Sequence, residues 1–377
     1  MTTTDRDPHT SSPDTPASGA TPKGPPMRAY RLFGQHDLRL RDEPDPDLKP
    51  GEARLRMAHV GVCGTDLHYY YAEDAAMPDR PQHIGHELSA TVTEVAPDVT
   101  SISVGDRVAV FPLISCGECG ECRAGYPISC ERVDRAVSTV GCGGPIGGLA
   151  ERTVIPADLA VTLPDSVSLL QGALIEPLSV AATAVLRANT NEDGVAVVTG
   201  AGLIGIGCAL ALRATGVSKV VVVELSAERR KNLADIEGLT VLDPASDDVA
   251  GIVASMSGGF GADVVFECAG AAKAMDLGFS VTRKRGRIVV IGLHQRPYSM
   301  NALLVMAKEL TIQGHSGYSR AAFEAVIDWM DRGLLPVEQW VTHVDFDRIV
   351  EDALEPSQRG QLVKAVIDVP QQTATSS

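Results

Sequence analysis

The stretch VAVVTGAGLIGIGCALALR, residues 195–213, decides the fold of the chain. A valine-rich run leads into the pattern G-x-G-x-x-G, formed by Gly200, Gly202 and Gly205, and an apolar run of helical length follows. The next valine-rich run ends in Glu224, about 20 residues after the third glycine. A strand that turns sharply into a helix, followed by a second strand that ends in an acidic residue, is the full fingerprint of a dinucleotide-binding βαβ unit.

Each glycine of this pattern has its own expected task. Gly200 makes the tight turn, Gly202 lets a pyrophosphate approach the backbone, and Gly205 allows close packing of helix and strand. We expect Leu203 and Ile204 at the start of the helix, where free N–H groups and the helix dipole favour an anion. All five residues are therefore predicted to bind the cofactor, and a glycine-rich turn without a ligand is the alternative.

Glu224 indicates which dinucleotide is preferred. Its carboxylate would accept hydrogen bonds from the adenosine ribose hydroxyls and would repel a 2′-phosphate, so NAD is favoured over NADP. Arg229 and Arg230 follow closely in the sequence and could accommodate that phosphate. NADP therefore stays as the less favoured alternative, with Arg229 as a candidate cofactor-binding residue.

The two halves of the chain have different sequence patterns, which together predict an α/β fold. Residues 28–165 read as short strands punctuated by proline and glycine, as in a β-rich domain. From about residue 181, valine and isoleucine runs alternate with helical stretches, which indicates a doubly wound parallel sheet covered on both faces. Residues 341–369 read as strand, helix and strand that could pack on either domain. The predicted divisions are a disordered tail (1–26), a β-rich domain (27–180), a dinucleotide-binding domain (181–316) and a C-terminal segment (317–377).

Composition excludes several classes of protein. The 377 residues carry 33 basic and 48 acidic side chains, a net charge of −15, which is a poor basis for binding nucleic acid. No apolar run approaches the roughly 18 residues of a membrane span. The tail at 1–26 is rich in Thr, Ser, Pro and Gly and lacks the apolar core of a secretory signal. We therefore expect a cytoplasmic protein that binds neither nucleic acid nor membrane.

Four of the eight cysteines form one short cluster with the spacing C-x2-C-x2-C-x7-C. The cluster comprises Cys116, Cys119, Cys122 and Cys130. Four thiolates on a glycine-containing loop can converge tetrahedrally, which predicts a structural zinc ion. An iron–sulfur cluster is the competing interpretation, although the proline that follows the last cysteine in such motifs is absent here. A third interpretation is that the four cysteines are surface thiols that bind no metal. A site with four protein ligands has no open position, so we expect it to hold the domain together.

A second group of possible metal ligands precedes this cluster. Cys63 opens the segment Cys-Gly-Thr-Asp-Leu-His, and His86 and Glu87 lie in the segment His83-x-x-His-Glu. The order of residues differs from the zinc-protease patterns, and an alternating strand follows, so a protease is rejected. Glu176 stands in an apolar stretch, where a carboxylate is costly unless it is paired, protonated or near a metal. A solvated glutamate at a helix start is the alternative for Glu176.

Together these motifs resemble the zinc-dependent medium-chain alcohol dehydrogenases, over about residues 27–369. Within that family the chain looks most similar to the polyol and vicinal-diol branch, which includes sorbitol dehydrogenase and (R,R)-butanediol dehydrogenase. The resemblance implies a GroES-like catalytic domain, a Rossmann domain and a C-terminal segment that returns to the catalytic domain. The motifs that carry it are Gly61-x-Cys63-Gly-Thr65-Asp66-x-His68, Gly85-His86-Glu87, the four-cysteine loop, Glu176-Pro-Leu and Gly200-Ala-Gly-x-x-Gly205.

The resemblance also implies a set of zinc ligands. Cys63 and His86 would bind a catalytic zinc ion, in addition to the structural one. Glu87 would be a third ligand or a close neighbour of the ligands. Glu176 stands where classical members of the family often have a cysteine ligand, and in the polyol branch the matching glutamate contacts the metal directly or through water.

The implied reaction is the NAD-dependent oxidation of a secondary alcohol, a polyol or vicinal diol, to a ketone, and the reverse. Thr65 would pass the substrate proton toward His68, while Asp66 is expected to be structural. The same chemistry on a threonine-like amino alcohol or on a cyclitol or sugar intermediate is the near alternative. Residues 69–82 and 131–148 depart most from the polyol pattern, so the substrate stays open. A non-catalytic paralogue is the remote alternative, and a homodimer or homotetramer is expected.

Several further residues have no assigned role at this level. Cys142 lies between glycines near the catalytic half and could be surface-reactive or line the substrate site. Cys208 is expected in the core, and Cys268 is expected to pack at a strand end. His294, His315 and Tyr318 fall in segments that could approach the nicotinamide or the substrate.

Overall fold

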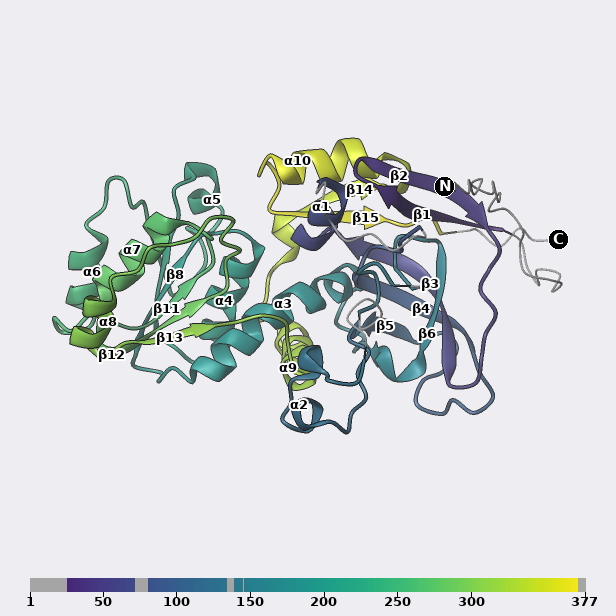
Figure 1. The fold of residues 1–377 in the computed structure, drawn as a ribbon, viewed down its shortest axis with the longest axis horizontal. Coiled ribbons are helices and arrows are strands. Elements are labelled where there is room, and N and C mark those ends of the chain that lie inside the picture. Colours follow the sequence, from purple (N-terminus) through teal and green to yellow (C-terminus); the bar gives the residue numbers. More distant parts are fainter. Residues whose placement is uncertain (1–25, 72–80, 134–138, 145, 372–377) are drawn as a thin grey trace, which may run out of the picture.

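The chain folds into two lobes that lie side by side, with a long helix, α3 (Leu169–Ala188), between them (Figure 1). The computed structural model describes residues 26–71, 81–133, 139–144 and 146–371. The predicted disordered tail lies outside the described residues apart from Pro26.

The first lobe is β-rich. A seven-stranded sheet runs in the order β14-β15-β3-β4-β5-β7, with β6 paired to β3 outside this path. The C-terminal strands belong to it because β15 pairs antiparallel with β3 and parallel with β14. Its strands are β3 (Glu52–Gly61), β4 (Glu87–Val95), β5 (Arg107–Val110), β6 (Arg152–Pro156), β7 (Ala160–Thr162), β14 (Val341–Asp345) and β15 (Lys364–Asp368). This half also contains the hairpin β1 (Met27–Gly34) and β2 (Asp37–Glu43), and the helices α1 (Gly64–Tyr71), α2 (Gly120–Arg123), α9 (Arg320–Asp331) and α10 (Glu355–Gln358). Its shorter helical turns are η1 (Pro127–Ser129), η2 (Ala157–Leu159), η3 (Glu338–Trp340), η4 (Phe346–Arg348) and η5 (Val350–Leu354).

The second lobe is a six-stranded parallel sheet in the order β10-β9-β8-β11-β12-β13. This is the strand order of dinucleotide-binding folds, whose ligands bind where the order reverses, here between β8 and β11. The lobe confirms the predicted α/β fold. Its strands are β8 (Val195–Thr199), β9 (Lys219–Val223), β10 (Leu239–Leu242), β11 (Ala262–Glu267), β12 (Thr282–Val290) and β13 (Thr311–Gly314). Its helices are α4 (Leu203–Ala214), α5 (Ala227–Lys231), α6 (Val249–Met256), α7 (Ala272–Val281) and α8 (Ala302–Lys308).

Helix α3 belongs to both lobes, since it packs on β4 of the first, on α4 of the second and on α9. It begins with a capping box, in which the Ser168 hydroxyl accepts from the Gln171 N–H and the Gln171 side chain accepts from the Ser168 N–H. By length and composition α3 could cross a membrane, but 72% of its most apolar window is buried inside the protein, as in a core helix. The predicted domain boundary at residue 180 falls within this helix.

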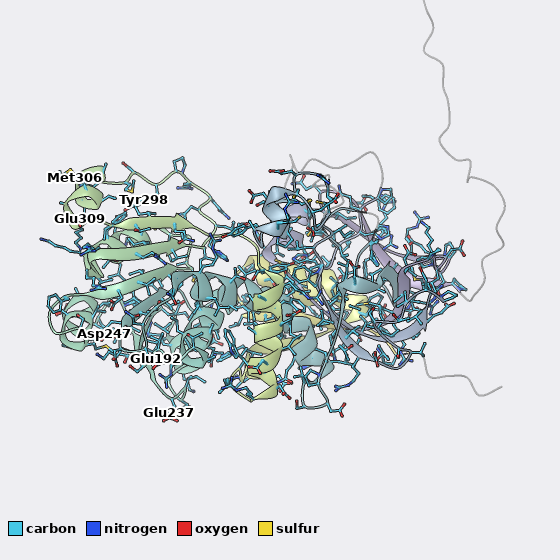
Figure 2. All side chains as sticks on the ribbon, turned by 90° about the horizontal axis from the view of Figure 1, so that it is seen from below. Glu192, Glu237, Asp247, Tyr298, Met306 and Glu309 are labelled. Carbon is cyan, nitrogen blue, oxygen red and sulfur yellow. The ribbon has the colours of Figure 1, made fainter. Side chains whose placement is uncertain are left out.

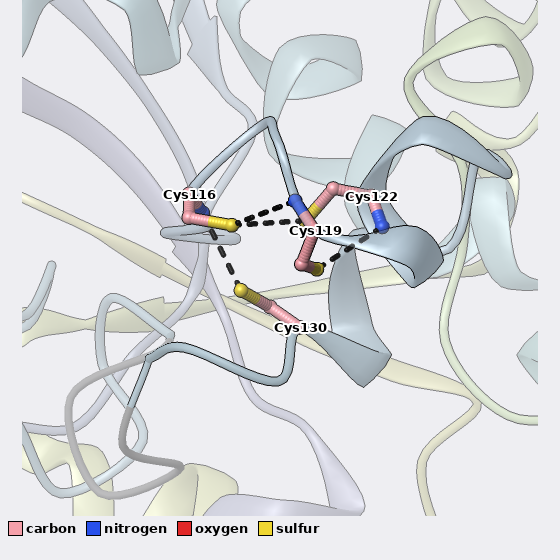
Figure 3. Close-up of side chains that lie close together, drawn as sticks. All are labelled: Cys116, Cys119, Cys122 and Cys130. Carbon is pink, nitrogen blue, oxygen red and sulfur yellow. Dashed lines mark hydrogen bonds between the residues drawn. The ribbon is translucent and has the colours of Figure 1, made fainter.

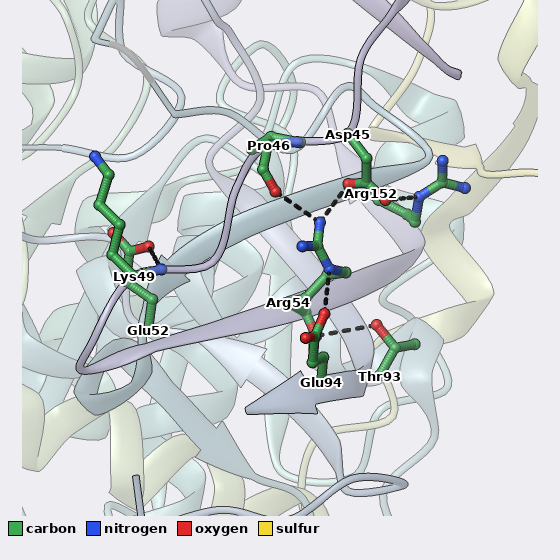
Figure 4. A network of polar contacts seen from close by, with 8 residues as sticks. All are labelled: Asp45, Pro46, Lys49, Glu52, Arg54, Thr93, Glu94 and Arg152. Carbon is green, nitrogen blue, oxygen red and sulfur yellow. Dashed lines mark hydrogen bonds and ion pairs between the residues drawn. The ribbon is translucent and has the colours of Figure 1, made fainter. Parts of the chain in front are cut away.

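An ion-pair network fixes the segment before β3 to the β-rich sheet (Figure 4). The Asp45 carboxylate accepts from Arg54 Nη1 at 2.5 Å and from Arg152 Nε at 2.7 Å, so one acidic group joins β3 and β6. Arg54 also donates to Glu94 on β4 at 2.9 Å and to the Pro46 carbonyl at 2.9 Å. Because the three central side chains are only 13–15% exposed, each charge depends on its partners for compensation.

We therefore expect Asp45→Ala to lower the free energy of unfolding by about 1–3 kcal/mol, less than for a fully buried pair because some solvent reaches all three side chains. Urea denaturation followed by circular dichroism measures the change. Asp37→Ala is the matched control, because Asp37 also accepts two hydrogen bonds from one arginine but on the exposed β2 surface. Equal losses in the two variants would contradict the importance of the Asp45 network.

Candidate catalytic and metal sites

A cavity of about 430 Å³ between the lobes brings together most of the predicted site residues. Its walls include both the possible metal ligands of the β-rich lobe and the glycine loop of the nucleotide lobe. The predicted residues that line it are Cys63, Thr65, His86, Glu87, Glu176, Gly202, Leu203, Ile204 and Gly205. Motifs separated by more than a hundred residues therefore share one space.

Cys63, His86 and Glu87 form a compact donor cluster. One ligand atom from each residue lies within 4.8 Å of the other two. Cys63 follows β3 and Glu87 begins β4, and the pairing of Gly61 with Glu87 in this antiparallel register brings the two ends together. A Cβ atom on Gly61 would lie 2.1 Å from the Glu87 carboxylate, so glycine is needed there. Thiolate, imidazole and carboxylate are all zinc ligands, and this donor set therefore fits a zinc ion.

Asp66 ties the two ligand-bearing segments together. Its carboxylate accepts from the Cys63 N–H at 2.8 Å and from the Gly85 N–H at 3.2 Å. Burial raises the pKa of Asp66, and the nearby His86 opposes that shift. With both oxygens bonded to backbone, the side chain fixes the spacing between the segments that carry Cys63 and His86.

Sequence reasoning missed Lys364. It lies on β15, is 4% exposed, and its ammonium donates to the Glu87 carboxylate and, at 2.9 Å, to the Val62 carbonyl. Glu87 is 1% exposed, so a cation beside it compensates a charge that would otherwise be costly to bury. The partners are 277 residues apart in sequence. The one local signal was a lysine inside the apolar run at 362–369.

Glu176 lines the same cavity but lies outside the compact donor cluster of described residues. It is 6% exposed on α3 and makes a side-chain hydrogen bond with Tyr318, which is also buried. Burial is the main cause that raises the pKa of Glu176 to about 7. The predicted burial of the Glu176 carboxylate is thus observed, and Tyr318 is its hydrogen-bond partner. Tyr318 itself lies in the cavity wall.

Thr65 and His68 lie three residues apart on α1, so they share one face of the helix. The Thr65 hydroxyl is 3.7 Å from the Cys63 sulfur. Both residues also line a second cavity of about 600 Å³, together with Leu293 and Gln295 of the nucleotide lobe. Thr65 therefore borders both the metal-ligand cavity and the cavity that contains His68.

The three loop glycines have different surroundings, in keeping with different tasks. Gly200 has a φ of +92°, which L side chains rarely adopt. A Cβ on Gly205 would lie 1.9 Å from the Gly200 carbonyl oxygen, so helix and strand approach too closely for any side chain. At Gly202 a Cβ would meet no atom within 4 Å, and this position faces open space.

Glu224 lies beside this loop at the end of β9. Its carboxylate accepts from the Ala201 N–H at 2.6 Å and from the Ser226 N–H at 2.7 Å. Arg229 donates to the Gly360 carbonyl at 2.9 Å, and Arg230 pairs with the Asp243 carboxylate at 2.7 Å. Both guanidinium groups are therefore bonded to protein acceptors.

The four predicted cysteines converge, with mutual ligand distances within 4.8 Å (Figure 3). Three backbone N–H groups point at sulfur atoms: Cys116 N to Cys130, Cys119 N to Cys116 and Cys122 N to Cys119, at 3.3–3.4 Å. The bond from the Cys116 N–H is the first of the causes that lower the pKa of Cys130 to about 6. Burial raises the pKa of Cys122 to about 11, whereas backbone donors also lower the pKa of Cys119. Four converging sulfur atoms, two of them favoured as thiolates by these donors, fit a zinc ion.

Of the residues left without a role, Cys142, Cys268 and Tyr318 line the cavity, and His294 lies outside its lining. The Cys268 sulfur is 3.9 Å from that of the buried Cys208 on α4. His294 Nε2 lies 2.9 Å from the carboxylate of Glu267, which is fully buried at the end of β11. Glu267 also accepts from two backbone N–H groups, so it organises the two loops that follow β11 and β12.

Comparisons with known proteins identify the family. Residues 49–165 match the alcohol dehydrogenase GroES-like domain, and residues 204–332 match the zinc-binding dehydrogenase domain. The chain therefore belongs to the zinc-binding alcohol dehydrogenases and is an oxidoreductase. This result confirms the predicted family and the predicted GroES-like and Rossmann domains.

The relatives are polyol and diol dehydrogenases. Sorbitol dehydrogenase of Arabidopsis thaliana is 35% identical over 340 residues, which are 87% of this chain and 91% of the relative. (R,R)-butanediol dehydrogenase of Bacillus subtilis is 32% identical over 350 residues, 90% of this chain and 96% of the relative. The crystal structure of 2R,3R-butanediol dehydrogenase from Bacillus subtilis has a TM-score of 0.82 and 30% identity, and the match covers 92% of this chain and 100% of that one.

Because the four-cysteine loop has little other support, we expect Cys119→Ser to lose one zinc ion per chain and to lower Tm by at least about 5 °C. Metal analysis of the purified protein and a thermal melt measure the two effects. Cys63→Ser is the control, since it removes a ligand from the other cluster and should leave Tm close to wild type. A Cys119→Ser protein with normal Tm and normal zinc content would contradict a structural metal site.

Proposed function

We propose that this enzyme oxidises a secondary alcohol that carries a neighbouring hydroxyl group, a polyol or vicinal diol, to the ketone, and catalyses the reverse reaction. NAD is its hydride acceptor, and each chain uses one catalytic and one structural zinc ion. The observation that carries this proposal is that the Cys63–His86–Glu87 cluster and the dinucleotide loop line one cavity. A redox-inert metal needs an electron acceptor beside it, and the glycine loop is suited to bind one.

Cys63 and His86 hold the catalytic zinc ion, and Glu87 is its third ligand or its close neighbour. When bound there, zinc supplies a Lewis acid that lowers the pKa of an alcohol and favours loss of its proton. Lys364 and Asp66 keep the donor groups in place through the contacts described above. Glu176 lines the cavity wall outside the compact donor cluster and contacts the metal directly or through water.

The proton leaves through Thr65 and His68. The Thr65 hydroxyl can accept the substrate proton and donate its own, because a hydroxyl is both donor and acceptor. The His68 imidazole can accept that proton and release it to solvent, because its two ring nitrogens can serve as donor and acceptor. The position of both residues on one face of α1, along the wall of the second cavity, supports this route.

The nucleotide loop supports NAD over NADP. The Glu224 carboxylate has free acceptor capacity beyond its two backbone bonds, so it can also accept from the ribose hydroxyls. Its charge opposes a 2′-phosphate. Arg229 and Arg230 are each bonded elsewhere and would have to leave these partners to bind such a phosphate.

The Glu176–Tyr318 pair supports a substrate with a second hydroxyl. It places a hydrogen-bonding carboxylate and phenol on the cavity wall close to the donor cluster. An amino alcohol or a cyclitol or sugar intermediate is the alternative substrate, because the segments at 69–82 and 131–148 depart most from the polyol pattern. Part of both segments lies outside the described residues. A non-catalytic paralogue would be expected to lack Cys63, Thr65 or His86, and all three are present.

We further propose a cytoplasmic homo-oligomer joined through the nucleotide lobe. Strand β13 is the edge of its sheet, and an edge strand offers unpaired backbone groups to another chain. Helix α8, which packs on the neighbouring strand β12, carries Leu303 and Met306, each 67% exposed. Figure 2 labels Met306 on this helix. None of the eight cysteines, all of them among the described residues, forms a disulfide, which supports a reducing compartment.

The reaction is tested by the appearance of NADH in the presence of 2,3-butanediol isomers, sorbitol, xylitol, threonine, inositols and simple secondary alcohols. We expect turnover with NAD and a diol or polyol, little with NADP, and loss of activity with a zinc chelator. Cys63→Ser should abolish turnover without a change in Tm, whereas Cys208→Ala, a buried thiol of α4, should keep it. Full activity of the Cys63→Ser enzyme would refute the catalytic assignment.

Assembly is tested by light scattering during size-exclusion chromatography. We expect Met306→Glu to convert the native oligomer into a smaller species, because a charge on the apolar patch beside β13 must be desolvated at an interface. Val104→Glu is the control, since Val104 is 63% exposed in the β-rich lobe. A native monomer, or an unchanged mass for Met306→Glu, would rule out this interface.

A further inference from the structure

We propose that Cys142 is a positioning residue for the catalytic metal site, in which its sulfur accepts a hydrogen bond from Nδ1–H of His86 and so directs Nε2 toward the zinc ion. This inference rests on the zinc chemistry of the proposed function. It concerns a residue that the motif pattern left without a role.

The contact itself is direct. The Cys142 sulfur lies 3.5 Å from His86 Nδ1, within the range of a hydrogen bond to sulfur, and both residues line the 430 Å³ cavity. A histidine that binds zinc usually donates its second ring N–H to a nearby acceptor, which selects the tautomer and fixes the ring. A cysteine sulfur is a weak acceptor that can fill this place.

The backbone around Cys142 is shaped for this approach. Gly141 has a φ of +73°, and a Cβ there would lie 2.0 Å from the Gly85 carbonyl oxygen. Gly143 has a φ of +84°, and its N–H donates to the His83 carbonyl at 3.0 Å. Both flanking residues therefore have to be glycine for the loop to lie against the segment that carries His86. The contact depends on this packing and not on a flexible side chain.

Two further hydrogen bonds fix the loop that carries Cys142. The Cys142 N–H donates to the Thr139 carbonyl at 3.3 Å, and the Tyr69 hydroxyl donates to the Cys142 carbonyl at 3.2 Å. The two oxygens of Asp66 accept from the Cys63 and Gly85 N–H groups, and among the described residues the side-chain atom within hydrogen-bond distance of His86 Nδ1 is the Cys142 sulfur.

Cys142 could instead be a second thiolate ligand of the metal. The geometry favours the positioning role, since the compact cluster of described ligand atoms consists of Cys63, His86 and Glu87 and does not include Cys142. The two roles differ in a measurable way. A ligand adds a sulfur–metal bond, whereas a positioning residue changes only the orientation and basicity of the imidazole.

The first experiment measures zinc affinity by competition with a chromophoric chelator. We expect Cys142→Ala, which removes the acceptor, to weaken binding at the catalytic site by about 10–100-fold. Cys142→Ser, which keeps an acceptor, should recover most of that loss. Cys208→Ala is the thiol control and should not change the affinity. The four-cysteine site should retain its zinc in all variants and serves as an internal reference. Equal affinity of the Cys142→Ala protein and wild type would overturn the inference.

The second experiment uses cobalt in place of zinc. We expect Cys142→Ala to shift the visible d–d bands of the catalytic site, and Cys142→Ser to restore them, while the sulfur-to-cobalt charge-transfer intensity stays the same. The four-cysteine site contributes equally to all spectra. A fall in charge-transfer intensity in both variants would overturn the positioning role and identify Cys142 as a ligand.

Failure of the proposed function would look different. In that case the wild-type protein would carry zinc at the four-cysteine site alone, before any variant is compared. A wild-type protein with both zinc ions, and a Cys142→Ala protein indistinguishable from it, would overturn only the role of Cys142.

Discussion

The buried ion pair between Glu87 and Lys364 is the contact on which the arrangement of the molecule depends. A carboxylate at 1% exposure needs a compensating charge, and the cation comes from the far end of the chain. To deliver it, the chain must leave the nucleotide lobe after β13 and add β14 and β15 to the first sheet. The same crossing packs α9 against α3, so the helix between the lobes is held by residues from both ends of the sequence.

How much of the site the sequence predicts depends on how far apart the interacting residues are. The glycine loop and the four-cysteine loop are local, since their spacing already determines which backbone groups meet. The donor cluster needed one further step, the resemblance to a family, because Cys63 and His86 lie on separate segments whose approach depends on the β3–β4 register. Their individual motifs are short, but their combination is specific.

The contacts that could not be predicted connect distant residues whose own sequence surroundings are ordinary. Lys364 meets Glu87, Tyr318 meets Glu176, and Cys142 meets His86 only in the folded chain. Lys364, Tyr318 and Cys142 lie outside the motifs that contain Glu87, Glu176 and His86. A lysine in an apolar strand or a cysteine between two glycines indicates that something is required, but only the packed structure shows what it faces.

The two candidate metal sites differ in what holds them together without metal. The four cysteines lie on a loop with the short helix α2, and the bonds among them are N–H donors to their own sulfur atoms. The Cys63–His86 site is instead assembled by strand pairing, by the Asp66 bonds and by the Lys364 ion pair. Metal at the first site therefore supplies order, whereas the second is preorganised, and little ordering entropy is lost when its ion binds. That difference is consistent with the proposed use of zinc in one domain both as a structural support and as a reactive centre.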